Sequence, residues 1–109
     1  MDRIVINGRE YRVEANWRAI TGYLKETGQD TLDGVADITS LSPSTIGDLM
    51  AACINEGERL VGRDSRVTKA ILDDMRPSEA VSVLQDFVKV YLSQVAPQVP
   101  PEAKKDEAR

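Results

Sequence analysis

The 109-residue chain contains no histidine and a single cysteine, Cys53, and these two shortages exclude several kinds of chemistry. Nucleophilic catalysis by a Ser-His-Asp or Cys-His system needs an imidazole that accepts a proton near neutral pH. A tetrahedral zinc site built from one chain needs several Cys or His ligands. One thiol also cannot close an intrachain disulfide, which favours a reducing compartment. We therefore expect no enzymatic activity, no metal and no cofactor.

Basic charge and long apolar runs are also scarce. The chain has 14 basic and 18 acidic residues, and residues 29–62 hold one basic residue and six acidic ones. Nucleic-acid binders usually carry a concentrated basic face, because neutralising phosphates supplies much of their affinity, so we expect no nucleic-acid partner. No apolar run approaches the roughly 20 residues that span a bilayer, and the N-terminus has no apolar signal-peptide core. These observations predict a cytosolic protein with no membrane partner.

The length is sufficient for one domain, which we place over residues 1–95 and predict to be mainly α with a short N-terminal β-hairpin (α+β). The hairpin covers residues 3–13, because Asn7-Gly8 favours a two-residue type I′ turn that pairs Ile4 with Tyr11. One side of the hairpin is then apolar, with Ile4, Ile6, Tyr11 and Val13, and the other side carries Arg3, Val5, Glu10 and Arg12. Since a lone hairpin is marginally stable, its apolar side should pack on a bundle of about four helices.

Four helices are predicted at about residues 17–27, 43–61, 65–74 and 77–94. Asn16 and Ser42 are suitable N-caps, Pro43 suits the first helical position, and Gly28 suits a helix C-terminus. Asp64 or Ser65 would cap the helix over residues 65–74. Residues 29–42 are predicted to form a partly helical connector. The proline-rich and charged segment 96–109 has no apolar face and is predicted to be a disordered tail.

Apolar spacing predicts the side of each helix that faces the core. The expected stripes are Trp17, Ile20 and Leu24; Ile46, Leu49, Met50, Cys53, Ile54, Gly57, Leu60 and Val61; Val67, Ala70 and Ile71; and Ala80, Leu84, Phe87, Val88, Tyr91, Leu92 and Val95. Cys53 is therefore expected to be a buried core thiol. Glu56 and Glu58 are expected to lie on solvated helix faces. Gly22 lowers helix propensity inside residues 17–27, which suggests a close contact there.

The order of these elements resembles that of a known family. A start of the form Ile-x-Ile-Asn-Gly-x-x-Tyr-x-Val at residues 4–13 is followed by an aromatic-led helix from Trp17 to Glu26-Thr27-Gly28. An acidic connector, a long helix over residues 46–60 and further helices complete the pattern. Over residues 2–94 the chain resembles the small tail assembly chaperones of long-tailed bacteriophages and prophages.

The resemblance implies a non-enzymatic protein in the cytoplasm of a bacterial host. Its partners would be the tape-measure protein, whose long apolar helix such chaperones keep in solution, and the tail-tube protein. Two alternatives remain. One is a generic acidic interaction or oligomerisation module, which includes self-association. The other is a carrier protein modified at Ser65, since Asp64-Ser65 at a helix start is similar to the attachment site of acyl carrier proteins, although Arg66 stands where they have an apolar residue.

Protein-binding residues are expected among exposed side chains on two surfaces. The open face of the hairpin offers Arg3, Val5 and Arg12, and Val5 is notable because it is apolar on an otherwise polar side. The long helix offers Glu56, Glu58 and Arg59.

Overall fold

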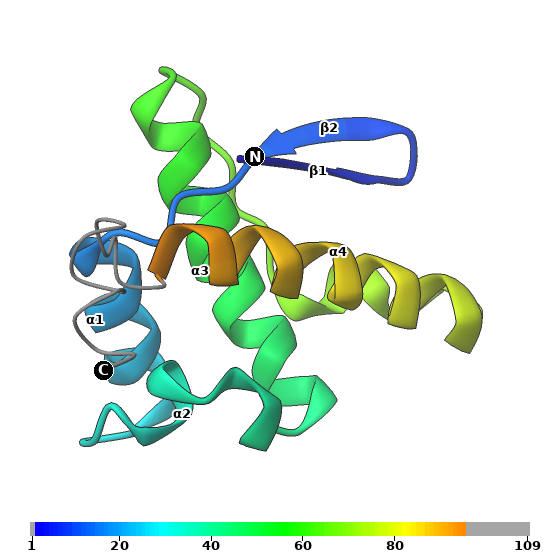
Figure 1. The fold of residues 1–109 in the computed structure, drawn as a ribbon. Helices are drawn as coiled ribbons and strands as arrows, with labels where there is room; N and C mark the ends of the chain where they lie inside the picture. Colours follow the sequence, from blue (N-terminus) through cyan, green and yellow to red (C-terminus); the bar gives the residue numbers. More distant parts are fainter. Residues whose placement is uncertain (1, 96–109) are drawn as a thin grey trace, which may run out of the picture.

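The computed structural model describes residues 2–95 and shows an α+β fold that is mainly α, as predicted (Figure 1). The predicted disordered tail, residues 96–109, lies outside the described residues. Within residues 2–95, an antiparallel hairpin of two strands is followed by four α-helices and two short 3₁₀ segments. The elements are β1 (Arg3–Ile6), β2 (Arg9–Arg12), α1 (Trp17–Thr27), α2 (Asp33–Ala36), α3 (Pro43–Leu60) and α4 (Pro77–Val95), with 3₁₀ turns at Ile38–Ser40 and Lys69–Leu72.

The hairpin has the turn and the register that the sequence predicts. Asn7 and Gly8 both adopt positive φ angles, 53° and 78°, as a type I′ turn requires. Ile4 pairs with Tyr11, and the Val13 N–H donates a hydrogen bond to the Asp2 carbonyl oxygen at 2.6 Å. The side chains of the predicted apolar side are all buried, namely Ile4, Ile6, Tyr11 and Val13.

The helix ends follow the predicted capping chemistry. The Asn16 side chain accepts a hydrogen bond from the Ala19 N–H at 3.0 Å, which satisfies a donor at the start of α1. Ser42 accepts in the same way from Thr45 at the start of α3, and Gly28 closes α1 in the left-handed conformation with φ 70°. Helices α1, α3 and α4 therefore match their predicted bounds to within one residue.

The predicted helix over residues 65–74 is wrong. This part of the chain has no α-helix, and Thr68 caps the 3₁₀ turn Lys69–Leu72 instead. The reason is a pair of hydrogen bonds to α3. The Asn55 amide group donates to the Val67 carbonyl oxygen and accepts from the Val67 N–H, both at 2.8 Å, so the side chain holds Val67 on α3 and engages the carbonyl group that a helix would pair with an N–H four residues later. Ser65 consequently does not lie at a helix start.

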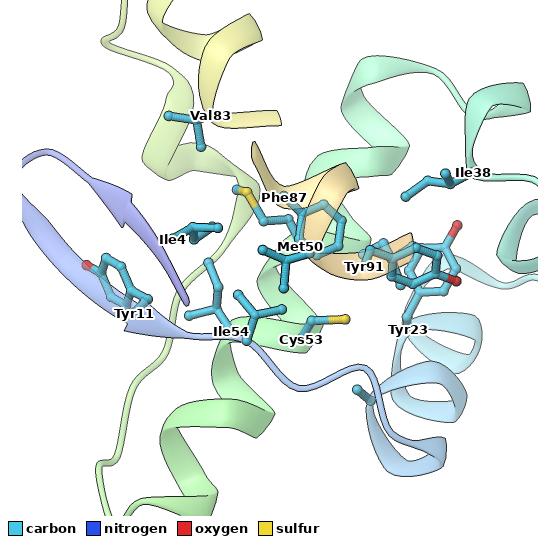
Figure 2. Packing of buried hydrophobic residues seen from close by; sticks show 14 of the residues in the cluster. Ile4, Tyr11, Tyr23, Ile38, Met50, Cys53, Ile54, Val83, Phe87 and Tyr91 are labelled. Carbon is cyan, nitrogen blue, oxygen red and sulfur yellow. The ribbon is translucent and has the colours of Figure 1, made fainter. Parts of the chain in front are cut away.

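Helix α3 lies at the centre of the core and contacts the hairpin, α1 and α4 (Figure 1). Figure 2 shows Met50, Cys53 and Ile54 of α3 among side chains of the hairpin, α1 and α4. Two aromatic residues of α4, Phe87 and Tyr91, pack with their ring centroids 5.7 Å apart. Cys53 is fully buried, which confirms the predicted core thiol.

Two predicted positions on α1 differ from the structure. Trp17, expected in the core, is 67% exposed, and Tyr23 is buried in the core. Trp17 is the first residue of α1, and helical side chains lean toward the N-terminus, so its indole projects beyond the end of the helix. No atom lies within 4 Å of a β-carbon built at Gly22, so the suspected close contact there is wrong.

The close contact occurs on α3 instead, at Gly57. A β-carbon built there would lie 2.6 Å from the Arg12 carbonyl carbon. The helix and strand β2 can approach this closely only because Gly57 has no side chain. Beyond this point α3 leaves the core, and Leu60 and Val61, also expected inside, are 46% and 42% exposed.

Candidate protein-binding site

Helix α4 has apolar side chains around more of its circumference than the rest of the fold covers. Its buried positions are Val83, Phe87, Val90 and Tyr91. The predicted stripe contains Phe87 and Tyr91 but misses Val83 and Val90, and it includes Leu92, which is 46% exposed. When residues are placed around the helix axis at 100° per residue, the apolar positions of α4 occupy an arc that runs from Val90 to Leu92 and covers roughly 200°. The part of this arc that faces away from the core is available to a partner.

Two residues of α3 extend this uncovered face into an open apolar groove of about 590 Å³. The groove is lined by Pro43 and Ile46 of α3 and by Val81, Leu84, Gln85, Val88 and Lys89 of α4. Val81 is the most prominent apolar side chain, with 51% of the residue exposed, whereas Ile46, Leu84 and Val88 are half-buried. Among the lining residues, polar groups come only from Gln85 and Lys89. The groove therefore offers apolar contacts with a narrow polar edge.

The open face of the hairpin is exposed where the sequence predicts it. Val5 is 55% exposed on β1. The Arg3 guanidinium lies 3.3 Å from the Glu10 carboxylate across the strands, and Arg12 lies 3.8 Å from the Asp2 carboxylate. These surface pairs are screened by water and contribute little to stability. Arg3 and Val5 thus remain accessible to a partner, and Arg12 is partly covered.

Glu58 is not a surface residue, which corrects the prediction. Its carboxylate is fully buried and joins the hairpin, α3 and the following loop. The guanidinium of Arg63 contacts it at 3.1 Å and that of Arg9 at 3.4 Å. The Arg12 N–H donates at 3.3 Å and the Ser65 hydroxyl donates at 3.4 Å. Because its hydrogen-bonding capacity is used within the fold, Glu58 serves to hold these elements together and cannot present its charge to a partner.

Glu56 is also buried, at 6% exposure, and it forms a second charged cluster with Arg59. Two nitrogens of the Arg59 guanidinium donate to the Glu56 carboxylate at 2.8 and 2.9 Å, and the Asn16 amide donates at 2.7 Å. Hydrogen bonds from Arg59 lower the pKa of Glu56 to about 2; the Asn16 hydrogen bond and the charges of Arg59 and Arg18 act in the same direction, and burial opposes them. Glu56 therefore keeps its negative charge and anchors Arg59, which is the exposed member of the pair.

Of the six predicted binding residues, Arg3, Val5 and Arg59 are exposed, Arg12 is partly covered, and Glu56 and Glu58 are buried; none of the six lines the groove between α3 and α4. The hydrogen bond from the Arg12 N–H to Glu58 links the hairpin to the end of α3. The sequence places Val81 only on the shoulder of the core-facing stripe of α4, and neither Val81 nor Gln85, which line the groove, is predicted to bind a partner. The signal in the sequence was the width of the apolar arc on α4. A helix whose apolar arc is wider than the side that packs on the core has apolar residues left for a second contact.

The environment of Cys53 disfavours reaction of its thiol. Burial raises the pKa of the Cys53 thiol to about 12, and the nearby charges of Glu14 and Glu56 add to this effect. A thiol in this state is a poor nucleophile because the thiolate is the reactive form.

Within residues 2–95, no group of three or more His, Cys, Asp or Glu side chains could hold a metal ion. None of the described helices is long and apolar enough to cross a membrane.

Comparison of the chain with protein-family models, with curated proteins and with solved structures found no match.

Proposed function

We propose that the protein is a non-enzymatic tail assembly chaperone of a long-tailed bacteriophage or prophage. In this proposal it binds the tape-measure protein in the cytoplasm of the bacterial host and helps to recruit tail-tube subunits. The observation that carries the binding role is the apolar groove between α3 and α4. The resemblance of residues 2–94 to such chaperones, through the Asn7-Gly8 hairpin and the helix that ends in Glu26-Thr27-Gly28, supports the choice of partner.

The groove suits the apolar side of a helix. From Val81 to Val88 it follows α4 for about two helical turns, or roughly 10 Å. A partner helix with apolar residues at spacings of three and four could place two or three anchors along this length. Gln85 and Lys89 would then border the contact and limit the sliding of the partner helix. The net charge of −4 would keep the complex dispersed while the apolar surface is covered.

The test is binding and solubilisation of a phage tape-measure protein, taken as the product of a very long gene downstream of the gene for this chain; a genome without such a gene would count against the proposal. A glutamate at Val81 would place a charge in the groove, and Val81 is exposed enough for the fold to tolerate it. Val5→Glu is the comparison variant, because Val5 is a valine of similar exposure on the hairpin, the other candidate binding surface, and lies outside the groove. We expect the native chain and Val5→Glu to keep the tape-measure protein in solution and Val81→Glu to lose at least about tenfold in affinity.

Two outcomes would contradict the proposal. If the native chain neither binds nor solubilises the tape-measure protein, the chaperone assignment fails. If Val5→Glu weakens binding and Val81→Glu does not, the partner binds the hairpin and the groove is not the site.

A generic interaction module that self-associates is the second candidate, because the same groove could be covered by another copy. Sedimentation equilibrium of the protein alone distinguishes the two. A dimer that Val81→Glu dissociates would favour self-association through the groove, and a monomer at all concentrations would exclude it.

A further inference from the structure

A cleft lies between α1 and α3 and shares no lining residue with the groove between α3 and α4. Its volume is about 640 Å³, which is within the range of small-molecule sites. Three arginines line it, Arg18 from α1, Arg59 from α3 and Arg63 from the loop that follows α3. We call this site the arginine cleft.

The guanidinium groups around the arginine cleft outnumber the buried carboxylates that hold them. Four guanidinium groups share two carboxylates of α3, which leaves two positive charges without a buried partner. The pairs are Arg59 at 2.8 Å and Arg18 at 4.0 Å from Glu56, and Arg63 at 3.1 Å and Arg9 at 3.4 Å from Glu58. The three arginine side chains that line the cleft are each more than half exposed. Because a guanidinium has five N–H donors in one plane, donors that the carboxylates do not use remain open to solvent.

Two exposed carboxylates also line the cleft, but neither neutralises the end that carries Arg18. Glu26 follows Arg18 by eight residues on α1, or roughly 12 Å along the helix axis, which exceeds the screening length of about 8 Å at physiological salt. Asp64 lies 4.0 Å from the guanidinium of Arg66, which is a further positive charge. The cleft therefore has a positive end.

Gly22 leaves free space beside these arginines. It lines the cleft one helical turn after Arg18, so the two residues share a side of α1. Glycine lowers helix stability relative to alanine, and Gly57 shows the usual reason to tolerate this, a close approach of backbone. Gly22 has no such reason, because within the described part of the chain no atom lies within 4 Å of a β-carbon built there. A larger side chain would extend into the cleft and occupy it.

We propose that the arginine cleft binds a small-molecule oxyanion, through a phosphate or carboxylate group that accepts hydrogen bonds from Arg18, Arg59 and Arg63. Guanidinium groups bind both kinds of oxyanion by charge-assisted hydrogen bonds. The buried carboxylates of Glu56 and Glu58 hold two of the three arginines in place, so less side-chain entropy is lost when the anion binds. This site does not depend on the groove or on the partner proposed for it.

NMR titration of the ¹⁵N-labelled full-length chain tests the proposal. Sodium phosphate and sodium glutarate are titrated separately, with sodium chloride replaced so that the ionic strength stays constant. We expect saturable shifts of the Gly22 and Gly62 amide signals and of the Nε–H signals of the three arginines, because all of these residues line the cleft. Saturation by phosphate alone, by glutarate alone or by both supports the site and identifies the group that it accepts. Shifts that do not saturate with either anion, or that saturate only outside the cleft, would overturn the proposal.

A charge variant and its control separate specific binding from general attraction. Arg18→Gln should weaken binding by about fivefold, since an exposed guanidinium contributes one charged contact. Arg76→Gln removes the same charge at an exposed position that does not line the cleft, and it should bind as the native chain does. An equal loss in both variants would show that only net charge matters and would overturn the proposal.

A space-filling variant tests the role of Gly22 without changing any charge. Gly22→Leu should weaken binding at least about tenfold, because its side chain would occupy the cleft. Its urea midpoint should be no lower than that of the native chain, since leucine favours helix more than glycine does, so lost binding would not reflect unfolding. Native affinity in this variant would also refute the proposal. None of these variants alters the groove, so the outcome is independent of tape-measure binding.

Discussion

Replacement of Gly57 by alanine should destabilise the protein, because the added methyl group would meet backbone atoms of β2. A β-carbon at this position would overlap the Arg12 carbonyl oxygen and lie 2.6 Å from the Arg12 carbonyl carbon and 2.9 Å from the Val13 nitrogen. Helix α3 and the hairpin would have to separate, and overpacking of this kind costs about 3 kcal/mol, which the higher helix propensity of alanine offsets by about 1 kcal/mol. We therefore expect a net loss of about 2 kcal/mol, or roughly 10 °C in Tm.

The matched control is Gly22→Ala. Gly22 also lies inside a helix, but no atom lies within 4 Å of a β-carbon built there, so only helix propensity changes. This variant should gain about 1 kcal/mol, and the two alanine substitutions should thus have opposite signs. Urea unfolding followed by far-UV circular dichroism measures both free energies of unfolding. A Gly57→Ala variant as stable as the native chain would refute the close approach of α3 to β2.

Three further predictions concern the buried polar groups. Glu58→Gln should lower the free energy of unfolding by about 2 kcal/mol, because a neutral amide weakens the charge-assisted hydrogen bonds to guanidinium groups. Glu10→Gln, which changes an exposed ion pair, should lower it by at most about 0.5 kcal/mol. Equal urea midpoints for the two variants would contradict this prediction. The pKa of Glu56 falls from its ordinary value of 4.5 to about 2 in the folded state, so the stability that its charge contributes is complete above about pH 5 and is lost as the pH falls to about 2. The difference in stability between the native chain and Glu56→Gln should therefore shrink over that range, and a constant difference would exclude the linkage. Cys53 should react with a thiol reagent only as the protein unfolds, because burial raises its pKa to about 12, and rapid labelling of the folded protein would show that the core is open.

Short-range chemistry made a large part of the fold predictable. The Asn7-Gly8 turn selects the hairpin register through its two positive φ angles, and Asn16 and Ser42 begin their helices by accepting hydrogen bonds from backbone N–H groups three residues away. Gly28 ends α1 for a similarly local reason. These interactions involve residues that are close in sequence, so the residue types and their spacing are enough to predict them.

The orientation of α4 could not be predicted in the same way. Apolar residues occupy a wide arc of this helix, and periodicity alone does not say which part of a wide arc faces the core. Helix α4 packs on both β1 and α3, and this placement buries Val83 and Val90 together with Phe87 and Tyr91 and leaves Val81 at the surface. The groove exists for this reason, and the choice depends on the positions of other elements.

The buried charges show the same dependence on distant parts of the chain. Glu58 resembles any polar residue of a long helix until Arg9, 49 residues earlier in the chain, folds over it. Residues 65–74 have the spacing of a helix, but Asn55 pairs with the backbone of Val67 and holds that part of the segment outside a helix. The pattern of residue types along the chain does not indicate which distant residues will become hydrogen-bond partners.

The amino-acid sequence alone set the fold class, the hairpin and the ends of the three longest helices, because turn geometry and helix capping operate over three or four residues. Packing between elements that are distant in sequence decided which of the remaining side chains are buried and which are exposed. It buried Glu56 and Glu58, exposed Trp17, and left one side of α4 uncovered, because burial depends on which surfaces the folded chain brings together and on which of them nothing else covers.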